Sequence, residues 1–161
     1  MTFTARVITC STRAAAGQWD DTSGPIIVAG LRDLGIKVAA PVVVADGEPV
    51  LDALRAAVTD GVDLVITTGG TGHTPRDLTP EMTKQVIDRE SPGLAEAIRT
   101  YGVSHGVPTA ILSRGIAGIA GTTLIVNAPG SSGGAKDTVA ALSPVLLHAL
   151  DQIAGGDHTR A

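Results

Sequence analysis

A glycine-rich loop is the segment of this sequence best suited to chemistry. Residues 67–72 read Thr-Thr-Gly-Gly-Thr-Gly and follow a short run of branched aliphatic residues. Gly69, Gly70 and Gly72 allow a tight turn whose backbone N–H groups, with the hydroxyl of Thr71, face an anion. Neither the Gly-Lys-Ser/Thr of a Walker A loop nor the G-x-G-x-x-G fingerprint is present. The loop alone therefore predicts either a phosphate cradle or a plain glycine turn.

Acidic residues lie close to this loop. Residues 75–81 read Pro-Arg-Asp-Leu-Thr-Pro-Glu, which places Asp77 just before a predicted helix and Glu81 in its first turn, while Asp46 follows an earlier aliphatic run. Carboxylates are hard ligands that suit Mg²⁺, which uses one or two of them together with substrate phosphates. The alternatives are dipole pairing at the helix start for Glu81 and loop stabilisation for the two aspartates. Arg76 either balances phosphate charge or lies in solvent.

A second glycine-rich loop also leaves an aliphatic run and precedes a predicted helix. Residues 127–134 read Asn-Ala-Pro-Gly-Ser-Ser-Gly-Gly. This layout predicts an anion site at a helix N-terminus, with Lys136 in the first turn as a source of positive charge. Arg114, which follows Ser113, is another cation in a sparsely charged chain.

Alternating strands and helices must position these loops. Aliphatic runs predict strands at residues 6–10, 38–44, 63–67, 109–113 and 123–126. Periodicity and capping signals predict helices at residues 24–34, 49–59, from 79 onward, at 93–103 and at 134–153. This alternation predicts one α/β domain over residues 1–154, three-layer α/β/α with a mostly parallel sheet, and a flexible tail at 155–161. Ligands of such folds bind at the carboxyl ends of the strands.

Single residues sharpen these boundaries. Thr22 or Ser23 is expected to cap the helix at 24–34, and Thr79 the helix that begins with Pro80. Pro41 predicts an edge position or a break in the strand at 38–44. Pro144 predicts a kink in the last helix.

Composition limits the partners and the chemistry. Lys plus Arg total 12 and Asp plus Glu total 16, a formal net charge of −4, and aromatic residues are 2%, which argues against nucleic-acid binding. No signal-peptide pattern opens the chain and no apolar stretch reaches about 18 residues, so we expect a cytoplasmic protein without a membrane span. Cys10 is expected to be a buried, inert thiol, with a nucleophile as the alternative. The histidine spacing and the lack of G-x-S-x-G favour neither a zinc site nor a serine hydrolase.

Taken together and in order, the motifs resemble a known family. Residues 67–81 (TTGGTGHTPRDLTPE), 112–114 (LSR) and 127–131 (NAPGS), with residues 14–25 and Asp46, resemble the molybdopterin adenylyltransferases, the MogA, MoaB and gephyrin G-domain family. The resemblance implies a molybdopterin-binding α/β fold, usually a homotrimer. It also implies transfer of AMP from MgATP to molybdopterin with release of pyrophosphate.

The resemblance implies roles for individual residues. Asp77 matches the essential carboxylate of the family's R-D-x-T-P-E motif and Asp46 the second acidic position, so both are candidate catalytic residues. Asp46, Asp77 and Glu81 are the candidate ligands of Mg²⁺. The candidate residues for binding ATP and molybdopterin are Ser11, Gly69, Gly70, Thr71, Gly72, Ser113, Arg114, Asn127, Pro129, Gly130 and Ser131.

The sequence departs from the family pattern at a few positions. Thr12 stands where the family's first loop often has an aspartate, Ala128 replaces the usual leucine, and residues 132–134 lack the frequent proline or lysine. The departure at Thr12 supports an alternative function, a non-catalytic pterin-binding carrier or scaffold. A third possibility is a hydrolase of nucleotide pyrophosphates. Nucleotide binding separates the carrier from the enzyme, and phosphate or AMP release without pterin identifies the hydrolase.

Overall fold

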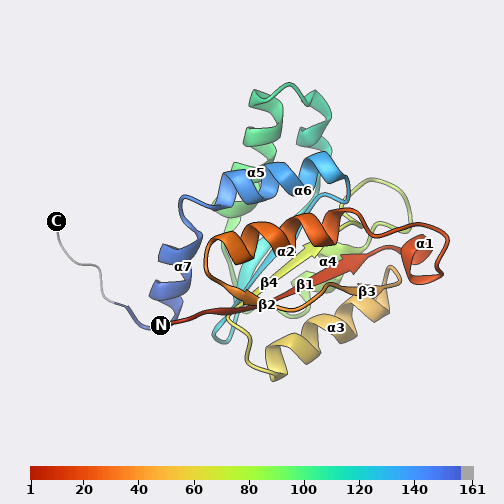
Figure 1. Cartoon of the computed structure of the whole chain (residues 1–161). Coiled ribbons are helices and arrows are strands. Elements are labelled where there is room, and N and C mark those ends of the chain that lie inside the picture. Colours follow the sequence, from red (N-terminus) through yellow and green to blue (C-terminus); the bar gives the residue numbers. More distant parts are fainter. Residues whose placement is uncertain (157–161) are drawn as a thin grey trace.

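The computed structural model describes residues 1–156, in which seven strands form one sheet with helices on both of its faces (Figure 1). The strands are β1 (Thr4–Cys10), β2 (Lys37–Val38), β3 (Val42–Val44), β4 (Leu64–Thr68), β5 (Arg89–Glu90), β6 (Ala117–Ala120) and β7 (Thr123–Ala128). The helices are α1 (Thr12–Ala15), α2 (Ser23–Asp33), α3 (Glu48–Thr59), α4 (Thr79–Lys84), α5 (Pro92–Ser104), the 3-10 helix η1 (Pro108–Leu112), α6 (Ser132–Leu142) and α7 (Leu146–Ile153).

The sheet is mostly parallel, and its register brings the glycine-rich loops together. The strand order is β2-β1-β4-β7-β6-β5, with β3 also paired to β1. β1 runs parallel to β2, β3 and β4, and β4 runs parallel to β7, while β6 runs antiparallel to both of its neighbours, β7 and β5. Thr68 pairs with Ala128, and Cys10 with Val44. The loops after these strands therefore leave one edge of the sheet, where ligands of such folds bind.

A hydrophobic core lies on each face of the sheet, formed by side chains of the strands and of the helices that cover that face. On β4, the side chains of Leu64 and Ile66 pack in the core shared with α2, α5, α6 and α7. The side chain of Val65, between them, packs with α3 and α4 on the opposite face. This alternation follows from the pleat of the strand. The three-layer α/β/α fold with a mostly parallel sheet, predicted from the sequence, is confirmed.

Residues 38–44 form two strands instead of the single strand predicted. β2 ends at Val38 and β3 begins at Val42, and the two pair with different stretches of β1. Pro41 lies between them and lacks the N–H that a continuous strand would use. The break expected at this proline is confirmed.

The strand predicted at residues 109–113 is wrong, because these residues belong to η1. Pro108 occupies the first helical turn, where its fixed φ suits a helix. Ile111 and Leu112 are exposed, so this apolar run has no sheet to cover it. Conversely, the sequence did not reveal β6, because a short run containing Gly118 has little strand propensity until β7 pairs with it.

The single helix predicted at 134–153 is two helices. α6 ends at Leu142 and α7 begins at Leu146, so Pro144 separates helices instead of kinking one. The hydroxyl of Ser143 donates to the carbonyl of Val139 at 2.5 Å, which satisfies an acceptor in the last turn of α6. Of the predicted tail, residues 157–161 lie outside the described residues.

The side-chain caps predicted for two helices, by Thr22 or Ser23 and by Thr79, do not form. Thr22 is the residue before α2 but its side chain makes no capping hydrogen bond; instead Oδ1 of Asp21 accepts the N–H of Gly24 at 3.0 Å. Thr79 lies inside α4, and its hydroxyl donates to the carbonyl of Gly69 at 2.9 Å. This hydroxyl ties the helix to the first glycine-rich loop. Residues 1–156 contain no helix with the length and apolar character needed to cross a bilayer.

Candidate functional site

Consecutive residues of the first glycine-rich loop line different cavities at the carboxyl edge of the sheet. Gly69 lines a cavity of about 340 Å³ whose wall is rich in serine and threonine, the hydroxyl cavity. Gly70 lines the carboxylate cavity of about 240 Å³, which also contains Asp46 and Asp77. Thr71 lines the apolar cavity of about 460 Å³ between α5, η1 and α6. One turn of the backbone therefore lines three neighbouring cavities.

The glycines of this loop are required by backbone shape and by crowding. Gly69 and Gly70 have φ of 98° and 67°, a region that side chains disfavour. A Cβ on Gly69 would collide with the carbonyl oxygen of Cys10, and one on Gly70 with the hydroxyl of Thr79. The loop is also tied to the second one, because the N–H of Gly69 donates to the carbonyl of Ala128 at 3.1 Å. The predicted phosphate cradle is thus a fixed turn packed against its neighbours.

Asp46 and Asp77 are held in the carboxylate cavity in the same way. Oδ2 of Asp46 accepts the N–H of Thr12 at 3.1 Å and its hydroxyl at 2.9 Å. Oδ2 of Asp77 accepts the N–H of Thr74 at 2.9 Å and its hydroxyl at 2.8 Å. Within residues 1–156, Oδ1 of neither aspartate accepts a hydrogen bond from the protein. Each carboxylate therefore has one anchored oxygen and one oxygen available to a ligand.

The donor set of this cavity suits a magnesium ion with phosphates. Two carboxylates are the ligands that Mg²⁺ uses when phosphates supply the remaining oxygens, and Cys10, which also lines this cavity, keeps its thiol protonated. Arg76 lines the same cavity and adds a positive charge. The available oxygens of Asp46 and Asp77 are the two atoms that could hold the ion.

Glu81 is not brought to this cavity with the two aspartates. It forms an ion pair with Arg114, and the hydrogen bond from that guanidinium lowers the pKa of the Glu81 carboxyl below its ordinary value. The same pairing raises the pKa of Arg114. Among residues 1–156, no three carboxylate, histidine or cysteine side chains gather where they could hold a metal ion. The candidate metal ligands that come together are thus Asp46 and Asp77.

Arg114 holds the glycine-rich loop from outside the cavities. Its Nε donates to the carbonyl of Gly72 at 2.8 Å and its Nη2 to the carbonyl of Asp77 at 2.6 Å. Its backbone N–H donates to the carbonyl of Thr71 at 2.9 Å. These bonds fix the segment that carries Asp77. In this structure Arg114 positions the loop, whereas the sequence suggested contact with a bound anion.

Asn127 also lies behind the site. It is 2% exposed, and its Nδ2 donates to the hydroxyls of Thr67 and Thr83, each at 2.9 Å. Its Oδ1 accepts the N–H of Ile116 at 3.1 Å. Every hydrogen-bonding group of this amide is used within the core, so Asn127 joins β4, β7 and α4 beneath the cavities.

The remaining predicted residues line the cavities, except Gly72. Ser11 and Ser131 line the hydroxyl cavity, and their hydroxyls accept the N–H groups of Ala14 and Gly134 as N-caps of α1 and α6. The other predicted residues that line cavities are Ser113 and Pro129 at the apolar cavity and Gly130 at the hydroxyl cavity. Gly72 lies against Asp77, since a Cβ there would be 2.8 Å from Oδ2 of that residue.

Sequence reasoning missed several side chains at the site. Thr74 had a local signal, because a threonine three residues before an aspartate favours a turn of this kind. Thr12 is 34 positions from Asp46, so only the fold reveals their contact. Trp19 lines both the hydroxyl and the carboxylate cavity. Cys10 is buried as predicted, and burial raises its pKa to about 12, so it remains a thiol at neutral pH.

The fold and the site define a class of protein. A mostly parallel sheet with cavities at its carboxyl edge, lined by backbone turns, hydroxyls and two carboxylates, is the arrangement of an α/β domain with a small-molecule site at that edge.

Comparison with known proteins gives the family. A family model described as "Probable molybdopterin binding domain" matches residues 6–148. The chain is 36% identical to a "Molybdopterin adenylyltransferase" of Helicobacter pylori, over 92% of this chain and 86% of that protein. A solved structure of the molybdopterin biosynthesis Mog protein of Mycobacterium ulcerans matches with a TM-score of 0.90 and 53% identity, over 94% of this chain and 99% of that one. The chain therefore belongs to the molybdopterin-binding domain family, and the predicted resemblance is confirmed.

Some relatives are much longer than this chain. A "Molybdenum cofactor biosynthesis bifunctional protein" of Synechococcus elongatus is 41% identical over 96% of this chain. The chain spans about half the length of that relative and of a second bifunctional one from Chlorobaculum tepidum, 48% and 49% respectively.

Proposed function

We propose that this chain is a molybdopterin adenylyltransferase that transfers AMP from MgATP to molybdopterin. The observation that carries the proposal is the carboxylate cavity, where Asp46 and Asp77 lie beside the glycine-rich loop with one oxygen each available. The name of the Helicobacter pylori relative, which this chain covers over 86% of its length, supports the same activity.

The reaction joins two anions, so charge and position dominate its barrier. A phosphate oxygen of molybdopterin forms a bond to the α-phosphorus of ATP, and the bond from that phosphorus to the bridging oxygen breaks, which releases pyrophosphate. Mg²⁺ held by Asp46 and Asp77 would neutralise phosphate charge and stabilise the leaving group. Arg76 adds positive charge, and Gly70, which has no side chain, lets phosphates approach the backbone of the turn closely, while the Gly69 N–H is already bonded to Ala128. The step needs no covalent protein nucleophile, which agrees with a Cys10 thiol that stays protonated.

Calorimetric titration of MgATP, with and without EDTA, tests this proposal. We expect binding that requires the metal and that is lost in Asp77→Asn, a variant that removes charge with little change of volume. Pyrophosphate release upon addition of molybdopterin under anaerobic conditions should follow the same pattern. Normal turnover by Asp77→Asn would overturn the metal-ligand role.

The alternatives give different results in the same titration. A pterin carrier would bind molybdopterin but show no MgATP binding, even after molybdopterin is bound, and no pyrophosphate release. The departure at Thr12 is compatible with the enzyme, because Thr12 anchors Asp46 with two donors. A nucleotide hydrolase would release phosphate or AMP from ATP without pterin.

The proposal includes a cytoplasmic homotrimer. The cytoplasm supplies MgATP, and the exposed apolar side chains of Ile111 and Leu112 on η1 offer surface for contact between subunits. Sedimentation equilibrium should give three times the chain mass of 16.2 kDa.

A further inference from the structure

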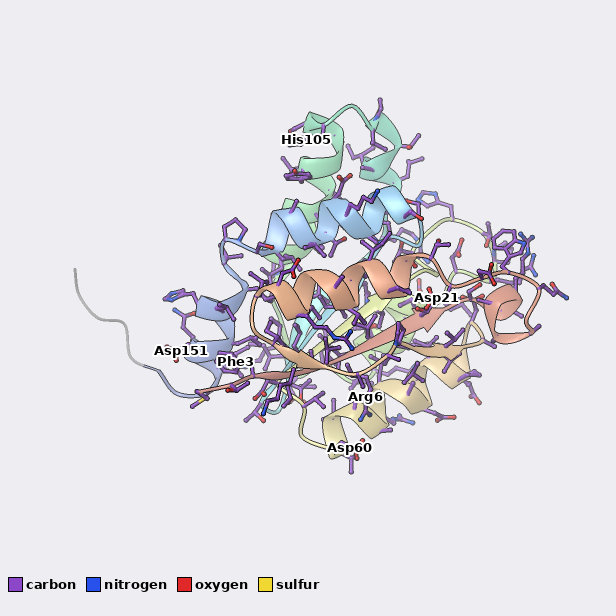
Figure 2. The ribbon with its side chains drawn as sticks, in the orientation of Figure 1. Phe3, Arg6, Asp21, Asp60, His105 and Asp151 are labelled. Atoms are coloured by element: carbon purple, nitrogen blue, oxygen red, sulfur yellow. The ribbon has the colours of Figure 1, made fainter. Side chains whose placement is uncertain are left out.

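Trp19 is the one aromatic side chain at the candidate site in the part of the chain that the structure describes. Phe3 is buried in the core, and Tyr101 stacks on His105 with ring centroids 3.8 Å apart. His105 marks the tip of α5, well away from Asp21 at the site (Figure 2). Trp19 is 60% exposed and lines the hydroxyl and carboxylate cavities together. This large apolar ring is therefore placed where it can contact a ligand bound in either cavity.

The backbone around Trp19 is ordered by its neighbours. The N–H groups of Gln18 and Trp19 donate to the carbonyl of Arg13 at 2.9 and 3.4 Å, which folds the chain back on α1. The preceding Thr12 is bonded to Asp46, so the segment is fixed to the carboxylate cavity.

The indole itself is held by a cation. The guanidinium carbon of Arg13 lies 4.4 Å from the centroid of the Trp19 ring. Such a contact orients a tryptophan while most of its surface stays in solvent. The result is a flat, preorganised surface at the border of two cavities, one of which contains the two carboxylates.

We propose that Trp19 is a positioning residue that stacks on the planar nitrogen heterocycle of a substrate bound in the hydroxyl cavity. This inference rests on the proposed function, whose two substrates both contain such a ring, adenine in one and pterin in the other. The cavity of about 340 Å³ has the size of a small-molecule pocket. Serine and threonine hydroxyls and the carboxylate of Asp20 line it and offer partners for the polar edge of a heterocycle.

The geometry also links the ring to the phosphates. Trp19 borders both cavities, so a substrate whose ring stacks on it in the hydroxyl cavity can extend its phosphates toward Asp46 and Asp77 in the next one. Stacking thus fixes which part of the substrate enters which space. It contributes to binding and alignment rather than to the bond-making step.

Trp19 is the only tryptophan of the chain, so its indole N–H gives one signal in a ¹H–¹⁵N spectrum. We would titrate labelled protein with MgATP, with 6-hydroxymethylpterin and with magnesium tripolyphosphate, which has charge but no ring. Stacking predicts an upfield shift of the indole signal by a ring-bearing ligand and little change with tripolyphosphate. A shift with MgATP identifies adenine as the stacked ring, and a shift with the pterin alone identifies pterin.

Substitutions supply the matched affinity test. Trp19→Ala should lower the affinity for the ring-bearing ligand about 5- to 150-fold, which is the effect of losing one stacked base. The affinity for tripolyphosphate should stay within about twofold of the parent's. Trp19→Phe should recover most of the loss, and the turnover number should change less than KM. Tyr101→Leu, which removes an aromatic ring on α5, is the control and should leave affinity unchanged.

The outcomes separate this inference from the function on which it rests. Calorimetric binding of MgATP or of the pterin with no indole shift by either ligand, or equal weakening of tripolyphosphate binding in Trp19→Ala, overturns the stacking role alone. Absence of binding by both MgATP and the pterin overturns the stacking role and the proposed function together. Thermal melting of each variant shows whether a loss of affinity follows from unfolding.

Discussion

The paired anchoring of Asp46 and Asp77 is the main device at the scale of single residues. Each aspartate gives one oxygen to the N–H and hydroxyl of a threonine and keeps the other oxygen available. Anchoring of this kind fixes the direction of a ligand atom before the ion arrives, and groups behind metal ligands commonly change affinity by 10- to 100-fold. Thr12 and Thr74 are therefore part of the site although neither is a ligand.

Thr12→Val tests this anchoring. The variant keeps the backbone donor and loses the hydroxyl, so we expect about tenfold weaker Mg²⁺ binding in the presence of ATP. Thr12→Ser, which keeps the hydroxyl, should bind Mg²⁺ almost as the parent does. Mn²⁺ titration followed by electron paramagnetic resonance measures the affinity without turnover. Equal affinities for the parent and Thr12→Val would show that the hydroxyl does not orient Asp46.

Glu81 gives a prediction about pH. Its folded pKa lies below the ordinary value of 4.5, so the ion pair with Arg114 stabilises the protein above pH 4.5 and is lost as pH falls through the folded pKa. Both side chains are more than a third exposed, so the contribution is below about 1 kcal/mol. Glu81→Gln should be slightly less stable than the parent at pH 7, with a smaller difference under acidic conditions. Urea unfolding of both proteins at pH 7 and under acidic conditions measures this difference in stability. A difference that grows on acidification would contradict the prediction.

The sequence identified Asp46, Asp77 and the glycine turns because those residues have unusual types or spacing. It did not separate residues that face a cavity from residues that support one. Asn127 is the clearest case, since its motif suggested a ligand contact and its amide is fully bonded in the core. That distinction depends on side-chain direction, which spacing alone does not give.

At the scale of elements, the position of the glycine-rich loop depends on backbone contacts that leave no room for a side chain. Gly69→Ala combines an unfavourable φ with a collision against the Cys10 carbonyl, so we expect at least about 2 kcal/mol of destabilisation. Gly93→Ala is the matched control, because that glycine lies in α5 with open space around it and should change stability by less than about 1 kcal/mol. Chemical unfolding of both variants measures the difference. Equal stabilities would show that the loop can move away from β1.

Elements with strong local signals were predicted well, and elements made by pairing were not. β4 has a continuous aliphatic run, and the apolar residues of α3 recur with the 3.6-residue period of a helix. η1 has an aliphatic sequence that suits a strand, but Pro108 in its first turn favours a helix. β6 forms on the edge of β7, and β5 forms in turn on the edge of β6. Tertiary context therefore decided the elements that propensity left open.

At the scale of the whole molecule, the site is assembled by the sheet. The loops that form the cavities leave β1, β3, β4 and β7, which pair side by side in register. A ligand that joins these loops therefore binds the folded sheet and has no equivalent site in the unfolded chain. Binding should consequently raise the free energy of global unfolding instead of stabilising one loop alone.

Thermal unfolding with ligand tests this coupling. At a concentration of MgATP one hundred times Kd, linkage adds about 2.7 kcal/mol to the free energy of unfolding. For a chain of this size, this corresponds to a rise in Tm of roughly 5–11 °C. ATP with EDTA, or MgATP with Asp77→Asn, should give a much smaller rise, because the carboxylate cavity then lacks either the ion or one of its ligands. An equal rise without magnesium would mean that the nucleotide binds independently of Asp46 and Asp77. A large rise that survives only in the parent with magnesium would mean that the phosphates, the ion and the sheet edge act as one binding unit.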